Sequence, residues 1–159
     1  MIVDDESLAL SRLKRLLNEN GIEDITAFDN PIEALKEITK TKFDAVFLDI
    51  SMPNITGLEL ADSIIQLEPK TFIIFQTAYS EFALEAYKSG GMGYLVKPIE
   101  SNDIKNILEK VRNFKSSLNE ESKKILGKRG DKLYLIDIND IYYIKADLDE
   151  VIVRIKDAD

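Results

Sequence analysis

Short apolar runs alternate with amphipathic stretches along the first 115 residues, and this alternation limits the fold more than any other feature of the chain. Residues 43–48 and 71–75 are nearly continuous apolar runs with β-branched and aromatic side chains. Such runs are typical of strands that are covered on both faces. Residues 25–28, residues 94–96 and the stub 2–3 resemble them, so the pattern predicts five strands.

Five helices are predicted between and after these strands, four of them from apolar residues spaced three or four positions apart. In the second helix Asn30 supplies a cap and Pro31 the first helical position. Residues 80–89 form the fourth helix, which Gly90 and Gly91 end. The apolar faces of the other four consist of Leu10, Leu13, Leu16 and Leu17; Leu35 and Ile38; Leu58, Ala61, Ile64 and Ile65; and Ile104, Ile107, Leu108, Val111, Phe114 and Leu118. Five strands alternating with five helices predict an α/β fold with a doubly wound parallel sheet.

The pattern changes after residue 115. Residues 116–124 are polar and predict either a linker or an extension of the fifth helix. Residues 132–136, 141–144 and 151–155 then indicate three strands of a meander, separated by Asp-rich turns. We therefore divide the chain into 1–115, 116–124 and 125–159, and the last part is a short all-β fragment that makes a poor core by itself.

The residue types that are present restrict the chemistry. The chain has no cysteine and no histidine, which excludes disulfides, thiolate nucleophiles and the usual zinc and general-base chemistry. The apolar runs are too short to span a bilayer and no basic and then apolar leader precedes them, so we expect a cytoplasmic protein. Residues 122–159 hold eight Lys or Arg and eight Asp or Glu, so the net charge of −8 arises before them. Neither part has the basic patch that a nucleic-acid surface requires.

Reactive side chains follow the predicted strands. Asp4 and Asp5 follow the first strand, Asp49 the third, Thr77 the fourth and Lys97 the fifth. Ligands of a doubly wound sheet bind beyond the carboxyl ends of its strands, so we expect these side chains to converge. Carboxylates held close together require a cation, and an all-oxygen set suits Mg²⁺. A carboxylate beside Mg²⁺ is a competent nucleophile toward a phosphoryl donor.

These residues lie in motifs that resemble the receiver domain of bacterial two-component response regulators. The resemblance covers about residues 1–115, in the order and spacing of the family. Its motifs are Ile2-Val3-Asp4-Asp5-Glu6, Leu48-Asp49-Ile50-Ser51-Met52-Pro53 with Gly57, Thr77-Ala78, and Tyr94-Leu95-Val96-Lys97-Pro98. The resemblance implies a five-stranded sheet with the flavodoxin-like strand order 2-1-3-4-5.

The resemblance also implies the phosphorylation chemistry. A partner sensor histidine kinase would phosphorylate Asp49. Mg²⁺ would be bound by Asp49, by Asp5 directly and by Asp4 through water, with the backbone carbonyl of Ser51 as a further ligand. The phospho-aspartate would hydrolyse slowly by itself, at a rate that Ser51 and Tyr79 tune from either side of the site.

The remaining residues of the motifs would respond to the phosphate. Lys97 would bind a phosphate oxygen, and Thr77 would move toward the phosphate while Tyr94 turns inward behind it. Four further residues would support the site: Pro98, Ala78, Gly57 and Pro53. The peptide bond between Lys97 and Pro98 would be cis. The fourth helix, fifth strand and fifth helix would form the face of a phosphate-favoured homodimer.

A second resemblance covers the end of the chain. The segment from Ile138 to Val153 resembles the opening strands of the LytTR-type DNA-binding domain, which follows the receiver in one class of transcription regulators. Only the first third of such a domain is present, so the resemblance implies DNA binding only through a full-length output domain. An unrelated β tail is the alternative.

Two other functions compete with a switch that controls transcription. Haloacid-dehalogenase phosphatases use a similar set of residues, but their nucleophile lies in an Asp-x-Asp motif on the first strand, with the second Asp as the general acid. Here the nucleophile follows the third strand, and Ser51 occupies the position of the general acid. We therefore expect no enzyme activity beyond Mg²⁺-dependent self-phosphorylation and slow self-dephosphorylation. The other alternative is a single-receiver interaction module or phosphate sink without DNA binding.

The amino end is shorter than in most receivers. Only Met1, Ile2 and Val3 precede the acidic pair. Because the first strand is central in this fold, we expect unpaired backbone groups on its neighbours, a lower stability, and a gain in melting temperature when apolar residues are added.

Overall fold

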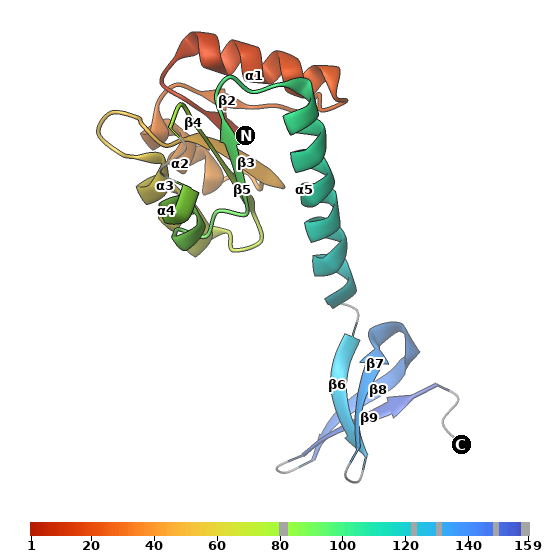
Figure 1. Cartoon of the computed structure of the whole chain (residues 1–159). Helices are drawn as coiled ribbons and strands as arrows, with labels where there is room; N and C mark the ends of the chain where they lie inside the picture. Colours follow the sequence, from red (N-terminus) through yellow and green to blue (C-terminus); the bar gives the residue numbers. More distant parts are fainter. Residues whose placement is uncertain (80–82, 122–123, 130–131, 148–149, 157–159) are drawn as a thin grey trace. The chain divides into compact units, whose positions relative to one another are not determined.

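Two units make up the chain in the computed structural model, Met1–Phe114 and Lys115–Asp159, and each is described by itself (Figure 1). The structure describes residues 1–79, 83–121, 124–129, 132–147 and 150–156. Within these ranges no helix has both the length and the apolar character needed to cross a membrane.

The first unit contains the predicted five-stranded parallel sheet. Its strands are β1 (Ile2–Val3), β2 (Ala27–Phe28), β3 (Ala45–Asp49), β4 (Phe72–Thr77) and β5 (Gly93–Val96). The sheet has the order β2-β1-β3-β4-β5, which confirms the doubly wound fold and its strand order. β2 is shorter than predicted because it pairs with the two-residue β1.

Five helices connect and follow the strands of this sheet. They are α1 (Ser7–Glu19), α2 (Pro31–Ile38), α3 (Gly57–Leu67), α4 (Ala83–Lys88) and α5 (Ser101–Glu121). The Asn30 side chain accepts a hydrogen bond from the Ile32 amide, as predicted for the cap of α2. The predicted start of the fourth helix falls on residues 80–82, which lie outside the described residues.

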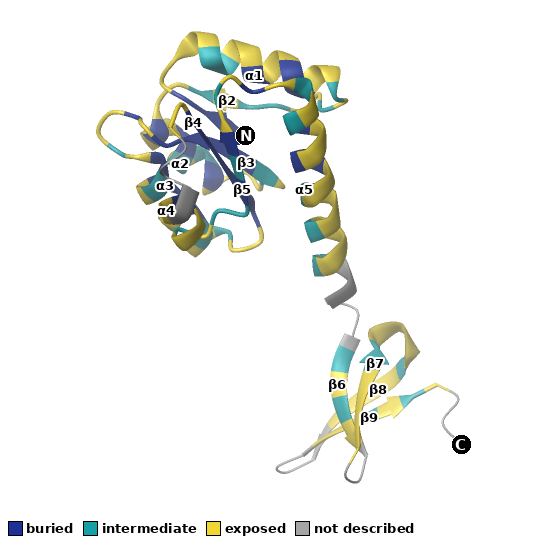
Figure 2. Ribbon diagram, in the orientation of Figure 1, coloured by how far each residue is buried: buried dark blue, intermediate teal, exposed yellow. Residues whose placement is uncertain are grey.

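The helices cover both faces of the sheet (Figures 1 and 2). α1 and α5 bury their apolar residues on one face, and α2, α3 and Ala86 of α4 do so on the other. β3 and β4 are buried along nearly their whole length, as their continuous apolar sequences predict. The two faces of the sheet are therefore covered, and Asp4, Asp49 and Thr77 lie at its carboxyl-terminal edge.

The amino end is better paired than the sequence led us to expect. The Met1 amine donates to the Ala45 carbonyl at 2.9 Å, and the Met1 carbonyl accepts from the Phe47 amide at 3.0 Å. The backbone of β3 beside Met1 is thus hydrogen-bonded, and Met1 itself is buried.

The second unit differs from the predicted three-stranded meander. It holds two antiparallel hairpins, β6 (Lys124–Arg129) with β7 (Lys132–Asp137) and β8 (Ile141–Asp147) with β9 (Glu150–Ile155). A short 3-10 helix (Ile138–Asp140) separates the hairpins. β6 was not predicted because Gly127 and three basic residues interrupt its apolar pattern. Residues 116–121 belong to α5.

Candidate functional site

On one face of the sheet, a row of polar side chains lies next to a row of apolar side chains, on the side of the carboxyl-terminal edge. Side chains two positions apart on a strand point to the same face. Four buried residues on neighbouring strands face α1 and α5: Ile2, Phe47, Ile74 and Leu95. Two positions further along the same strands, toward the carboxyl edge, come Asp4, Asp49, Gln76 and Lys97. The alternation of the strands therefore brings two carboxylates, an amide and an amine together at one edge.

Asp4 is held by three donors. Its side chain is fully buried. Its Oδ1 accepts from the Glu6 amide at 3.0 Å, and its Oδ2 accepts from Gln76 Nε2 at 3.1 Å and from Lys97 Nζ at 2.7 Å. A buried carboxylate requires such partners, because each missing one leaves a costly unsatisfied charge.

Asp49 shares the same lysine. Lys97 Nζ donates to Asp49 Oδ1 at 2.8 Å, and the Ser51 amide donates to Asp49 Oδ2 at 2.8 Å. Asp49 is 5% exposed at the end of β3, while Ser51 is exposed on the loop that follows. The carboxylate is thus fixed from two sides and lies at the edge of the sheet.

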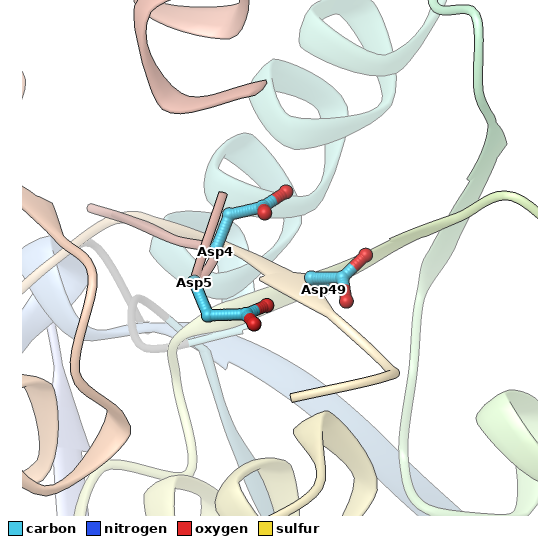
Figure 3. Close-up of side chains that lie close together, drawn as sticks. All are labelled: Asp4, Asp5 and Asp49. Carbon is cyan, nitrogen blue, oxygen red and sulfur yellow. The ribbon is translucent and has the colours of Figure 1, made fainter. Parts of the chain in front are cut away.

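Asp5 completes a group of three carboxylates. One oxygen from each of Asp4, Asp5 and Asp49 lies within 4.8 Å of the others. Figure 3 shows the three side chains beside one another, with Asp5 and Asp4 adjacent on the chain and Asp49 coming from β3. Three carboxylates and the one ammonium of Lys97 leave two negative charges in this group. An all-oxygen donor set with this charge fits a hard divalent cation such as Mg²⁺.

The pKa directions reflect this crowding. Burial raises the pKa of Asp4, against the hydrogen bonds from Lys97 and the Glu6 amide, which lower it. Burial also lowers the pKa of Lys97, but its hydrogen bonds to Asp4 and Asp49 outweigh burial, so this pKa is raised. Asp4 and Lys97 form an ion pair, since Asp4 has three donors and one ammonium serves two carboxylates at short distances.

The predicted switch residues are joined through Tyr79. Thr77 is buried at the end of β4, and its Oγ1 accepts from the Tyr79 amide at 3.3 Å. The Tyr94 hydroxyl donates to the Tyr79 carbonyl. Tyr94 is half-buried and packs against the core under α2 and α3. Tyr79 therefore links Thr77 to the hydroxyl of Tyr94 through two hydrogen bonds.

The four supporting residues lie around this edge. The Lys97–Pro98 peptide bond is cis, as the resemblance implied. Gly57 is buried at the first position of α3, where an added Cβ would lie 2.1 Å from the Asp49 carbonyl oxygen. Ala78 and Pro53 are exposed on the loops after β4 and β3.

Gln76 belongs to this site although the sequence reasoning passed over it. It is 1% exposed and donates to Asp4 from the residue before Thr77. A signal was present in the sequence: β4 places apolar Phe72 and Ile74 on one face, and the next residue of that face is an amide. A polar side chain at a buried position requires a partner, and here the partner is a predicted site residue.

The chain is similar to known proteins in sequence and in structure. The family model described as the response regulator receiver domain matches residues 1–109. The chain is 39% identical over 160 residues to an uncharacterized response regulatory protein of Shewanella oneidensis, an alignment that covers 93% of this chain and 65% of that protein. It is 32% identical over 162 residues to the transcriptional regulatory protein BtsR of Salmonella typhi, which covers 96% of this chain and 67% of that protein.

A solved structure agrees with these matches. The crystal structure of the response regulator protein TrrA from Thermotoga maritima, in complex with Mg(2+)-BeF, has a TM-score of 0.64 and 36% sequence identity. The similarity covers 69% of this chain and 95% of that chain. The sequence alignments reach further than this, because 93% of the chain includes much of the second unit. The chain spans less than two thirds of the Shewanella protein.

Proposed function

The chain belongs to the response regulator receiver family, and from this premise we propose that it is a signalling switch set by phosphorylation of Asp49. The observation that carries the proposal is the group of Asp4, Asp5 and Asp49 with Lys97, which leaves two negative charges at the open edge of the sheet. This group offers a nucleophile, oxygen donors for a divalent cation, and the Lys97 ammonium for a phosphoryl oxygen.

Asp4, Asp5 and Asp49 are the residues that hold Mg²⁺ in this proposal, together with the Ser51 carbonyl. Bound there, Mg²⁺ neutralises the charge that gathers on the transferring phosphoryl group. The fit rests on the oxygen donors and on the uncompensated charge of the group.

The chain's own residues then have separate tasks. A carboxylate oxygen of Asp49 attacks the phosphorus of the donor, so that an O–P bond forms while the donor's bond to phosphorus breaks and the donor keeps that electron pair. Lys97, which already bonds Asp49 at 2.8 Å, turns to a phosphate oxygen. The Thr77 hydroxyl donates to another phosphate oxygen. The donor is the phosphohistidine of a sensor histidine kinase.

The switch lies in the link between Thr77 and Tyr94. Moving Thr77 toward the phosphate changes the position of the Tyr79 amide, and the Tyr79 carbonyl carries the Tyr94 hydroxyl with it. Exposed Tyr87 of α4 and Val96 of β5 lie on the predicted dimer face, so the change favours a homodimer through α4, β5 and α5. Ser51 and Tyr79 are both exposed, two residues after Asp49 and Thr77 respectively, and in this proposal they set the rate of self-hydrolysis.

The output is transcriptional in this proposal. Residues 1–115 are the receiver, 116–124 extend or link the fifth helix, and 125–159 begin a LytTR-type domain that binds DNA only in a full-length protein. Two observations support this: α5 continues to Glu121, and a relative aligned through the second unit is the transcriptional regulatory protein BtsR. The cytoplasmic location stays a prediction.

Acetyl phosphate tests the central claim. We expect the chain to gain the mass of one phosphoryl group in the presence of Mg²⁺, and to gain none with EDTA. Asp49→Asn is expected to stay unmodified, while Asp62→Asn, an exposed carboxylate on α3, serves as the matched control and is expected to behave like the wild type. Equal modification of Asp49→Asn and wild type would overturn the assignment of the nucleophile.

A further inference from the structure

Gln76 is a polar residue at a buried position of β4. It follows Phe72 and Ile74 on the face of β4 that packs under α1 and α5, and it is 1% exposed. Burying an amide in this way is unfavourable unless a hydrogen-bond partner satisfies it. Its partner is Asp4 Oδ2, at 3.1 Å from Gln76 Nε2.

The bond joins strands that are not neighbours. β4 pairs with β3 and β5, and β1 pairs with β2 and β3, so the Gln76 side chain reaches across β3 to Asp4. Its own backbone holds the Asp49 segment, because Gln76 is in register with Asp49 and the Gln76 carbonyl accepts from the Ile50 amide at 3.2 Å. One residue thus contacts both buried carboxylate segments of the site, one through its side chain and one through its backbone.

The Asp4 oxygen that Gln76 contacts is also the one that Lys97 contacts. Lys97 Nζ lies 2.7 Å from Asp4 Oδ2 and 2.8 Å from Asp49 Oδ1. If Lys97 turns to a phosphoryl oxygen, as the proposed function requires, Asp4 Oδ2 keeps only the amide among the described donors. A neutral donor satisfies the oxygen without changing the charge of the group, which neither a carboxylate nor a second amine in this place could do.

We propose that Gln76 is a positioning residue that holds the Asp4 carboxylate for metal binding while Lys97 exchanges Asp4 for phosphate. This inference rests on the proposed function and goes further, because it assigns a role to a residue outside the motifs. Partners that orient a metal-binding carboxylate typically alter metal affinity by about tenfold or more when they are removed. The amide therefore contributes to Mg²⁺ affinity and not to the nucleophilicity of Asp49.

The test is a Mg²⁺ titration of Gln76→Met, which keeps the length of the side chain and removes the donor. Isothermal titration calorimetry is expected to show Mg²⁺ binding weakened about tenfold. The Mg²⁺ concentration that half-saturates phosphorylation by acetyl phosphate is expected to rise by the same factor, while the rate at saturating Mg²⁺ stays within about twofold of wild type. Gln66→Met, on the exposed side of α3, is the matched control and is expected to change neither value.

The outcomes separate the inference from the function beneath it. Unchanged Mg²⁺ affinity in Gln76→Met, beside normal binding by the wild type, would show that Gln76 only fills space. Gln76→Leu gives the same comparison if Gln76→Met does not fold. A wild type that binds no Mg²⁺ and is not phosphorylated would overturn the proposed function itself, and the role of Gln76 with it.

Discussion

Gly57 lies against the backbone of the Asp49 segment, and replacing it with alanine perturbs the site sterically. α3 begins at Gly57, whose amide donates to the Ile50 carbonyl at 3.0 Å. A Cβ there would lie 2.1 Å from the Asp49 carbonyl oxygen, 2.9 Å from its carbon and 3.0 Å from the Ile50 Cα. All three are backbone atoms, so no side-chain rotation can relieve the contact.

The expected cost of Gly57→Ala follows from this contact. Overpacking of a tight interior costs about 1 to 3 kcal/mol, and backbone neighbours place this substitution at the upper end. Alanine regains up to about 1 kcal/mol over glycine in a helix, so we expect a net loss of about 2 kcal/mol. Moving α3 or the Asp49 segment also disturbs the 2.8 Å bond between the Ser51 amide and Asp49. Phosphorylation by acetyl phosphate is therefore expected to slow about tenfold or more.

Urea unfolding followed by circular dichroism measures the loss, and Gly21→Ala is the matched control. Gly21 has a φ of +82°, but an added Cβ there meets nothing within 4 Å. Gly21→Ala is therefore expected to lose about 1 kcal/mol from backbone strain alone and to be phosphorylated normally. A Gly57→Ala protein that is as stable as wild type and is phosphorylated at the same rate would refute the steric reasoning.

Two further perturbations test the charges of the receiver unit. Lys97→Met removes the ammonium shared by Asp4 and Asp49. In Mg²⁺-free buffer we therefore expect the free energy of unfolding in urea to fall by about 3 kcal/mol, and Mg²⁺ to restore part of it. An equal loss in the exposed control Lys105→Met would contradict this. In a chain that begins at Met1, burial lowers the pKa of the amine from 8.0 to about 6. Between pH 8 and 6 the unfolded chain binds a proton that the folded chain does not, so the free energy of unfolding is expected to rise by about 2 kcal/mol from pH 6 to 8. The gain is expected to vanish in an N-acetylated chain, and its persistence there would assign it to other groups.

The sheet could be predicted because its strands are covered on both faces. Short, continuous apolar runs such as those of β3 and β4 are typical of buried parallel strands. Amphipathic helices between such strands are the crossover connections of a parallel sheet. The second unit was harder to predict. β6 is a strand because it pairs with β7, where Ile125 is opposite Ile136 and Leu126 is opposite Leu135. Its six residues include Gly127 and three basic side chains, so their own sequence pattern does not indicate a strand.

Asp49 and its neighbours show where sequence reasoning ends at the site. The acidic pair, Thr77 and Lys97 follow predicted parallel strands, and the carboxyl ends of such strands meet at one edge whatever the details of packing. Which oxygen meets which donor depends instead on contacts between distant segments. Gln76 and Asp4 are 72 residues apart and Lys97 and Asp4 are 93 apart, yet their atoms lie within 3.1 Å. Hydrogen bonds are lost over a shift of less than an ångström, so only the packed sheet, with its register and its covering helices, selects these partners.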